Sequence, residues 1–227
     1  MCKKDIISTP TPKKRGLFII GVTGSMGCGK STVTKLFANM GARLLDADKM
    51  AREVVLPGEI GWQEVVEYFG DDILLSSING KELPYKQRPL NRKKLGEQIF
   101  KNPAKRKVLE AIIHPKIVKI KAEILKKWEM ELTNGESRIV VMEVPLLFEA
   151  GLDKGCNLTI AVVCGDEQLS RLSERKSMST TTKKAAIAQQ LSEAEKKSRA
   201  DIVIDNSGDL AGTIFQVEKI FKQITKS

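Results

Sequence analysis

The stretch GVTGSMGCGKST, residues 21–32, decides the fold. It fits the pattern G-x-x-x-x-G-K-[ST] from Gly24 to Ser31, it follows the β-prone run LFIIGV, and it precedes apolar residues at helical spacing. Small residues at these positions let backbone N–H groups wrap phosphates without intervening Cβ atoms, and the following helix N-terminus adds partial positive charge. The motif and its context therefore predict a P-loop that binds a nucleoside triphosphate.

Each position of this loop has an expected role. Lys30 is expected to reach the β- and γ-phosphates, and the Ser31 hydroxyl to ligate Mg²⁺, which is the expected cofactor with ATP. The remaining expected ATP-binding residues of the loop are Gly24, Gly27, Cys28, Gly29 and Thr32.

The rest of the chain alternates buried β-prone runs with helical patterns, which predicts an α/β fold with a parallel sheet flanked by helices. Five strands are expected, at LFIIGV, RLL, RIVVMEV, LTIAVV and DIVID. The core is expected at about residues 17–50, 138–165 and 201–227, and it ends in a helix near residues 209–226.

Three segments stand apart from this core. Residues 51–134 show helical patterns without a convincing buried strand, which predicts a helical insertion. A polar helical stretch at about residues 166–200 predicts a mobile lid. Residues 1–16 are basic and lack the apolar segment of a signal peptide, so a disordered tail is expected there.

Charge and hydropathy narrow the possible partners. The 38 basic residues exceed the 28 acidic ones by 10, a balance that suits either nucleic acid or small polyphosphates. No basic cluster is interleaved with aromatic side chains as a base-stacking surface requires, and no apolar run approaches the ~20 residues of a membrane span. We therefore expect no nucleic-acid or membrane partner. A monomer is expected as well, although neither charge nor hydropathy bears on the oligomeric state.

The cysteines indicate the compartment. Cys2, Cys28, Cys156 and Cys164 show neither close paired spacing nor a metal-ligand pattern. They are interpreted as free thiols of a reducing compartment, which predicts a cytoplasmic protein.

Two aspartates follow the second expected strand, in the sequence LLDADKMAREVV. In an extended chain Asp46 and Asp48 lie on the same side, and ligands of doubly wound sheets bind at the carboxyl ends of strands. Carboxylates there could orient the waters of a metal ion or accept a hydroxyl proton. Asp48 could equally cap the helix that follows. The spacing alone leaves both alternatives open.

Five segments together resemble the dephospho-CoA kinase family: TGSMGCGKSTV, MGARLLDAD, LEAIIHP, VPLLFE and ADIVIDNSG, in this order. The resemblance runs from Leu17 to the C-terminus, so residues 17–227 are expected to form a kinase domain. It implies transfer of phosphate from ATP to the ribose 3′-hydroxyl of dephospho-CoA, giving coenzyme A and ADP in the last step of coenzyme A biosynthesis. It also implies the strand order 2-3-1-4-5 and a helical insertion that binds the CoA moiety.

The resemblance assigns residues to the acceptor and nucleotide sites. It makes Asp48 the base for the acceptor hydroxyl, and it places Arg52, Arg92 and His114 in the dephospho-CoA site. Taken alone, a histidine ahead of a proline is a helix-boundary residue. Asn206, in the sequence DNSG, falls where the family holds adenine, although an ordinary Asn/Gly turn is the alternative.

The expected lid carries two arginines at i, i+4, Arg171 and Arg175. They are either a solvated basic face or, as the resemblance implies, catalytic groups that close over the transferring phosphoryl group, where developing charge favours guanidinium contacts.

The sequence departs from the family pattern at three places. The connection NGKELPYKQRPLNRKKL before and after Arg92 is longer, which predicts a larger surface loop. Glu143 stands where many members have aspartate, so no metal role is assigned to it. Cys28 replaces a serine, and it is either a reactive thiolate covered by bound phosphates or an inert group in the helix–sheet packing.

Other nucleotide-dependent classes fit less well. A nucleoside or nucleotide kinase shares the P-loop, insertion and lid, and only the acceptor-side segments favour dephospho-CoA over it. A GTPase is excluded because the chain has no N-K-x-D motif.

Overall fold

The computed structural model describes residues 16–133, 135–165 and 190–225. The predicted tail and the predicted lid arginines Arg171 and Arg175 lie outside these residues. The chain divides into two compact units. We call them the core unit (Met1–Leu45 with Trp128–Ser227) and the helical unit (Asp46–Lys127).

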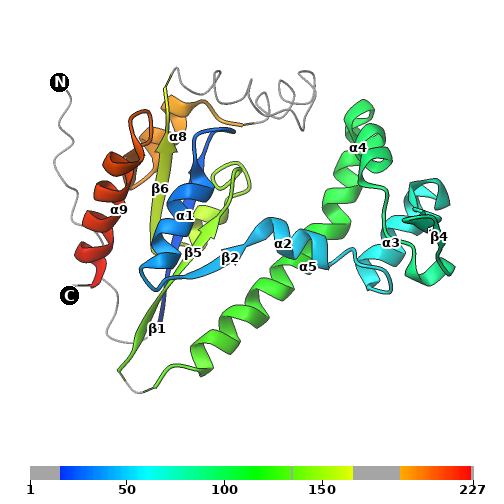
Figure 1. The fold of residues 1–227 in the computed structure, drawn as a ribbon, viewed down its shortest axis with the longest axis horizontal. Helices are drawn as coiled ribbons and strands as arrows, with labels where there is room; N and C mark the ends of the chain where they lie inside the picture. The colour runs from blue at the N-terminus through cyan, green and yellow to red at the C-terminus, as the bar shows by residue number, and fades with distance from the viewer. Residues whose placement is uncertain (1–15, 134, 166–189, 226–227) are drawn as a thin grey trace. The chain divides into compact units, whose positions relative to one another are not determined.

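The core unit is built on a five-stranded sheet of order β2-β5-β1-β6-β7 (Figure 1). Its strands are β1 (Gly16–Gly24), β2 (Arg43–Asp46), β5 (Ser137–Glu143), β6 (Leu158–Val163) and β7 (Ile202–Asp205). β1 pairs in parallel with β5 and β6, and β6 pairs in parallel with β7. The predicted fold class and strand order are confirmed.

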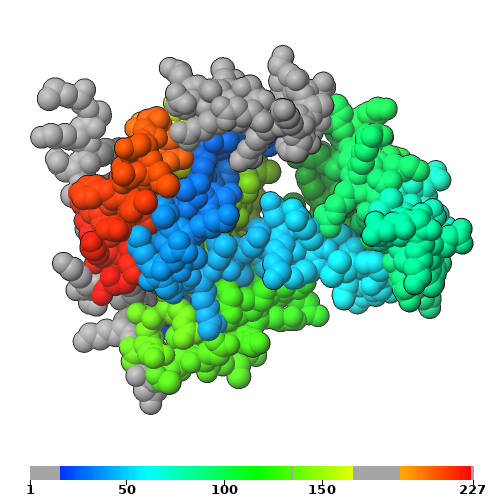
Figure 2. Space-filling view, in the orientation of Figure 1, coloured from blue at the N-terminus to red at the C-terminus, as the bar shows by residue number. Residues whose placement is uncertain are grey.

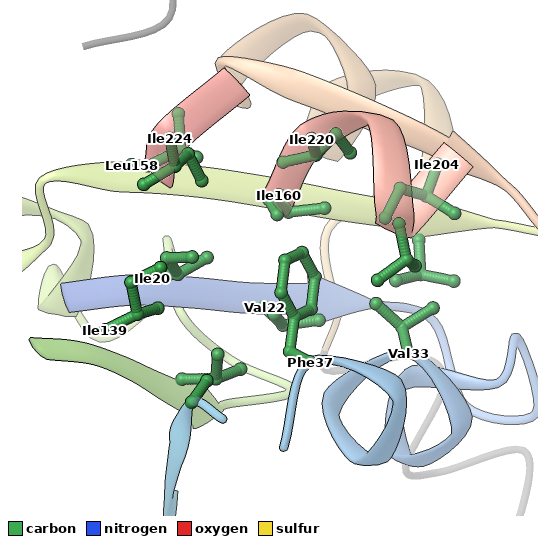
Figure 3. Close-up of a cluster of buried hydrophobic side chains, with 14 of the residues drawn as sticks. Ile20, Val22, Val33, Phe37, Ile139, Leu158, Ile160, Ile204, Ile220 and Ile224 are labelled. Carbon is green, nitrogen blue, oxygen red and sulfur yellow. The ribbon is translucent and has the colours of Figure 1, made fainter. Parts of the chain in front are cut away.

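Two helices cover one face of this sheet, α1 (Lys30–Asn39) and α9 (Leu210–Thr225). Successive side chains of a strand point to opposite faces, so Ile20 and Val22, two residues apart in β1, both point to this face. There they pack with Phe37 of α1 and Ile220 of α9 (Figure 3). The space-filling view shows the two helices packed side by side, α1 in blue and α9 in orange to red (Figure 2). This apolar layer fixes the strand-to-helix turn between β1 and α1.

The opposite face carries a polar anchor around the carbonyl of Pro145. The Thr23 hydroxyl and the buried Lys196 ammonium both donate to this oxygen, at 3.3 and 2.9 Å, and Lys196 also pairs with Glu149 at 3.5 Å. Lys196 lies on α8 (Glu193–Arg199), which begins with a capping box between Ser192 and Glu195. Burial lowers the pKa of Lys196, although the Glu149 carboxylate favours the charged form. These contacts hold α8 against the sheet.

The helical unit has a hydrophobic core of its own. Its elements are α2 (Ala47–Glu53), α3 (Ile60–Phe69), the 3₁₀ turn η1 (Asp71–Ile73), α4 (Arg92–Lys101) and α5 (Pro103–Met130), whose last residues belong to the core unit. Trp62, Phe69, Leu95 and Leu109 are among the buried residues that hold these helices together.

The longer connection predicted before Arg92 is an exposed hairpin. It consists of β3 (Ser77–Ile78), β4 (Lys81–Glu82) and the 3₁₀ turn η2 (Tyr85–Gln87). The Trp62 indole donates to the Arg88 carbonyl at 2.9 Å, and the Tyr85 hydroxyl donates to Asp71 at 2.6 Å. This hydrogen bond raises the pKa of Tyr85.

The expected helix boundary at His114 is wrong. Pro115 lies inside α5, which continues through it. A proline removes one helical hydrogen bond, but Ile113 and Ile117 on either side of it pack against the core of the helical unit. Apolar packing therefore outweighs the local signal. No helix in the described ranges, α5 included, is long and apolar enough to cross a membrane.

Candidate nucleotide-binding site

The loop between β1 and α1 requires glycine at two positions. Gly29 precedes α1 with φ of +85°, and the Asn206 amide occupies the space that a Cβ would need. At Gly24, φ is +150° and a Cβ would meet the Val162 carbonyl. The glycines of the motif are therefore required by the close approach of β6 and of the segment after β7.

Backbone donors line this loop. Met26 N–H donates to the Gln190 side chain, and Cys28 N–H donates to the Ser25 carbonyl. Within the described part of the chain, no hydrogen bond uses the N–H groups of Gly27, Gly29 or Ser31. Together with the N-terminus of α1, they form a cradle suited to an anion.

Lys30 lies over the same loop. Its ammonium donates to the carbonyls of Gly24 and Ser25, at 3.0 and 3.1 Å, and the residue is only 8% exposed. The positive charge is thus held beside the cradle.

Glu143 brings a carboxylate to the start of α1. It ends β5, the neighbour of β1, and accepts hydrogen bonds from the hydroxyls of Ser31, at 3.0 Å, and Thr34, at 3.3 Å. Hydroxyl and carboxylate oxygens are ligands that Mg²⁺ prefers. The sequence analysis assigned no metal role to Glu143, because many members of the family have aspartate at this position. The signal that could have identified it is its place at the end of a strand next to the P-loop strand.

Asn206 braces the loop from the other side. Its amide nitrogen donates to the Cys28 carbonyl at 2.9 Å, and its amide oxygen accepts from the Thr213 hydroxyl at 2.7 Å. Asn206 is buried, and both of its amide polar atoms are engaged within the protein. Asn206 therefore holds the loop, and its expected part in ATP binding stays a prediction.

We expect Asn206→Asp to raise the KM for ATP about tenfold, because a carboxylate facing the Cys28 carbonyl removes a donor that shapes the loop. Thr213→Val is the matched control, since it removes the second hydrogen bond of Asn206 but leaves the donor to Cys28. It should lower the free energy of unfolding by about 1–2 kcal/mol with a smaller effect on KM. Steady-state kinetics gives the KM for ATP, and urea unfolding gives the free energy of unfolding. Equal KM values for the two variants would show that the hydrogen bond from Asn206 to the Cys28 carbonyl does not shape the loop.

The sequence suggested that all four cysteines are free thiols, and this interpretation is wrong for two of them. The structure joins Cys28 to Cys164, which follows β6, in a disulfide with a Cα–Cα distance of 5.1 Å. Cys28 is fully buried in the helix–sheet packing and bonded to Cys164, so it fits neither alternative: its sulfur is not exposed beside the phosphates, and it is not an inert group. The pairing brings together residues 136 apart in the sequence, which is why spacing gave no signal for it.

Asp46 and Asp48 occupy different positions relative to helix α2: Asp46 caps it, and Asp48 lies within its first turn. Asp46 ends β2 and caps α2, its carboxylate accepting from Lys49 N–H at 2.9 Å. Asp48 lies in the first turn of α2 and is exposed, so the alternative that Asp48 is the cap is wrong. The expected extended pair is also wrong, because the helix begins at Ala47.

The other expected acceptor-site residues lie on helices of the helical unit. Arg52 is in the last turn of α2, on the same face as Asp48 at i, i+4. Arg92 begins α4 after the cap at Asn91, and His114 is in α5. The side chains of Arg52, Arg92 and His114 are exposed, whereas the capping residue Asn91 is half-buried. The structure therefore brings Lys30, Ser31, Glu143 and Asn206 together in the core unit, and Asp48 with Arg52 in the helical unit.

The parallel sheet, the glycine-rich loop and the lysine and carboxylate beside it define the class as a P-loop kinase fold. Comparison with known proteins gives the family. The family model described as Dephospho-CoA kinase matches residues 18–212. The chain therefore belongs to the dephospho-CoA kinase family, which carries out the ATP-dependent phosphorylation of dephospho-CoA in coenzyme A biosynthesis. The resemblance found in the sequence is confirmed.

Relatives and solved structures agree. The Dephospho-CoA kinase of Arabidopsis thaliana is 37% identical, covering 92% of this chain and 84% of its own. That of Bacillus licheniformis is 38% identical, with 89% and 94% covered. The structure of TT1252 from Thermus thermophilus matches with TM-score 0.71 at 28% identity, covering 93% of this chain and 100% of that one. The Dephospho-CoA kinase from Campylobacter jejuni matches with TM-score 0.60 at 26% identity, covering 93% and 99%.

Proposed function

We propose that this kinase transfers the γ-phosphoryl group of MgATP to the ribose 3′-hydroxyl of dephospho-CoA, acting as a cytoplasmic monomer. The observation that carries the site assignment is the convergence of Lys30, the Ser31 hydroxyl and the Glu143 carboxylate on one loop. A basic chain also suits two substrates that are both polyphosphates.

The phosphate chain of ATP is bound by the loop. The N–H groups of Gly27, Gly29 and Ser31 donate to its oxygens, and the N-terminus of α1 adds partial positive charge. Lys30 exchanges its contacts with the Gly24 and Ser25 carbonyls for the β- and γ-phosphate oxygens. The positive groups therefore lie where charge develops during transfer.

Ser31 and Glu143 fit a hard divalent cation. The Ser31 oxygen lies 3.0 Å from Glu143 Oε1, so a hydroxyl and a carboxylate oxygen already face each other. Ser31 and Glu143 would hold Mg²⁺, which would neutralise part of the negative charge of the phosphate chain. Thr34 donates to the second carboxylate oxygen and thereby orients Glu143.

We expect Glu143→Gln to raise the Mg²⁺ concentration for half-maximal activity by roughly 10–100-fold, because the amide keeps the shape but loses the negative charge. Glu143→Asp is the control that restores the charge, with a smaller shift. Activity is measured as a function of free Mg²⁺ at saturating ATP. An unchanged Mg²⁺ dependence in Glu143→Gln would remove this residue from the metal site.

The acceptor residues lie in the helical unit (Asp46–Lys127), which overlaps the predicted insertion at residues 51–134 and also contains Asp48. Asp48 orients the acceptor hydroxyl and accepts its proton, and its exposed carboxylate is not used as a helix cap. Arg52, Arg92 and His114 bind dephospho-CoA. Arg171 and Arg175, at i, i+4 in the predicted lid at residues 166–200, contact the transferring phosphoryl group.

An acceptor panel separates this function from a nucleoside or nucleotide kinase. ADP release is measured with MgATP and either dephospho-CoA, adenosine or AMP. We expect kcat/KM for dephospho-CoA to exceed the others at least about 100-fold, since acceptor contacts missing from the smaller molecules lower transition-state binding. Comparable turnover of AMP or adenosine would favour the alternative kinase.

A further inference from the structure

Two cysteines meet beneath the phosphate loop, one of them within the loop itself. Cys28 lies between Gly27 and Gly29, and Cys164 directly follows β6. Their Cα atoms are 5.1 Å apart, within the range of disulfides, and both residues are fully buried. We propose that Cys28 and Cys164 are a reversible redox site, whose disulfide fastens the phosphate loop to the end of β6 and whose reduction releases it.

The surroundings of the pair suit both redox states. Glu193, the first residue of α8, accepts from Cys164 N–H at 3.1 Å, and the same carboxylate oxygen lies 3.8 Å from Cys28 Sγ. A reduced Cys28 thiol therefore has a hydrogen-bond acceptor beside it, whereas the disulfide is accommodated among apolar residues of the core. The two sulfurs and the Glu193 carboxylate could also bind a soft divalent cation. The experiment below distinguishes a metal site from a redox site.

The oxidation proceeds by thiol–disulfide exchange with a low-molecular-weight disulfide. One cysteine thiolate attacks a sulfur of the small disulfide, which forms a mixed disulfide and releases one small thiol. The second cysteine thiolate attacks the protein sulfur of the mixed disulfide, forms the Cys28–Cys164 bond and releases the second small thiol. The two protons and two electrons lost by the protein end on the two released thiols, and the reverse sequence reduces the pair.

Exchange requires the loop to open, because both sulfurs are buried. The backbone N–H groups of the loop bind the phosphates of MgATP, so bound nucleotide lowers the population of the form in which the loop is open. At ATP about ten times above its Kd, reduction of the disulfide is expected to be about tenfold slower than without nucleotide. This part of the inference rests on the proposed ATP site.

The disulfide leaves the phosphate side of the loop intact. The Cys28 carbonyl is held by the Asn206 amide at 2.9 Å, while the sulfur points into the core. A link across 136 residues restricts the unfolded chain, and within the folded chain it restricts the loop. The oxidised form is therefore expected to unfold at a temperature about 5–15 °C higher and to bind ATP a few-fold more tightly.

The experiment uses the full chain, oxidised with glutathione disulfide or reduced with a phosphine. Remaining thiols are alkylated and the linkage is mapped by mass spectrometry, and thermal unfolding is measured in both states. Dephospho-CoA is left out because its own thiol would exchange with the protein. Cys164→Ser should abolish the linkage and the redox-dependent shift in Tm, whereas the matched control Cys156→Ser should retain both.

Three results would overturn the redox site: no linkage between Cys28 and Cys164 after oxidation, an equal Tm in both states of the wild type, or tight zinc binding by the reduced protein that depends on both cysteines. ATP binding in the two states is measured separately by calorimetry. If neither state bound ATP, the proposed function would fail, while the mapped linkage and the shift in Tm would still decide the redox site.

Discussion

Lys30→Ala is expected to lower kcat about 10³-fold while the protein stays folded. The ammonium is held beside the loop by the Gly24 and Ser25 carbonyls, so it is positioned to stabilise charge that develops on the phosphate oxygens. Losing two hydrogen bonds of this kind costs about 1–3 kcal/mol of folding free energy, far less than the loss in transition-state stabilisation. Coupled detection of ADP gives kcat, and circular dichroism with thermal unfolding reports the fold.

Lys35→Ala is the matched control for this change. Lys35 is exposed on the same helix, α1, and lies outside the phosphate loop. It should keep a kcat close to that of the wild type. A Lys30→Ala variant that turned over at a comparable rate would show that Lys30 does not act on the phosphates.

Asp48→Asn is expected to lower kcat by about 10²–10⁴-fold with ATP binding retained. The amide preserves the shape of the side chain but can neither carry the charge nor accept the hydroxyl proton. Asp48 is exposed and is not the cap of α2, so its loss should leave the free energy of unfolding nearly unchanged. Steady-state kinetics, ATP binding by calorimetry and urea unfolding separate these effects.

Asp46→Ala gives the opposite pattern and serves as the control. Asp46 caps α2 through Lys49 N–H, so its removal should cost about 1 kcal/mol of stability. If Asp48→Asn lost only stability and kept its kcat, Asp48 would have no part in activating the acceptor.

The local patterns of the sequence predicted the fold well. The glycine spacing from Gly24 to Ser31 and the apolar runs such as LFIIGV depend on neighbours along the chain, and the structure has a strand, loop and helix at these places. Two of the errors are also local. The α2 helix begins one residue before Asp48, so Asp46 takes the cap, and α5 runs through Pro115 because apolar packing on both sides outweighs one missing hydrogen bond.

Contacts between distant segments could not be predicted from the sequence. Ser31 and Glu143 are 112 residues apart, and Asn206 reaches Cys28 across 178 residues. Cys28 and Cys164 meet because β1 and β6 are neighbours in the sheet, a relation that the spacing of cysteines does not contain. Only the paired strands bring these groups together, so the brace and the disulfide are visible only in the folded chain.

The proposed reaction is transfer of phosphate from ATP to the ribose 3′-hydroxyl of dephospho-CoA. The most direct measurement incubates the full chain with MgATP and dephospho-CoA, identifies the product by mass, and locates the new phosphate by phosphorus–proton NMR. We expect a product with the mass of coenzyme A, phosphate on the 3′-oxygen, and one ADP per product molecule. No product while an authentic dephospho-CoA kinase works in the same mixture, or phosphate at another oxygen, would contradict it.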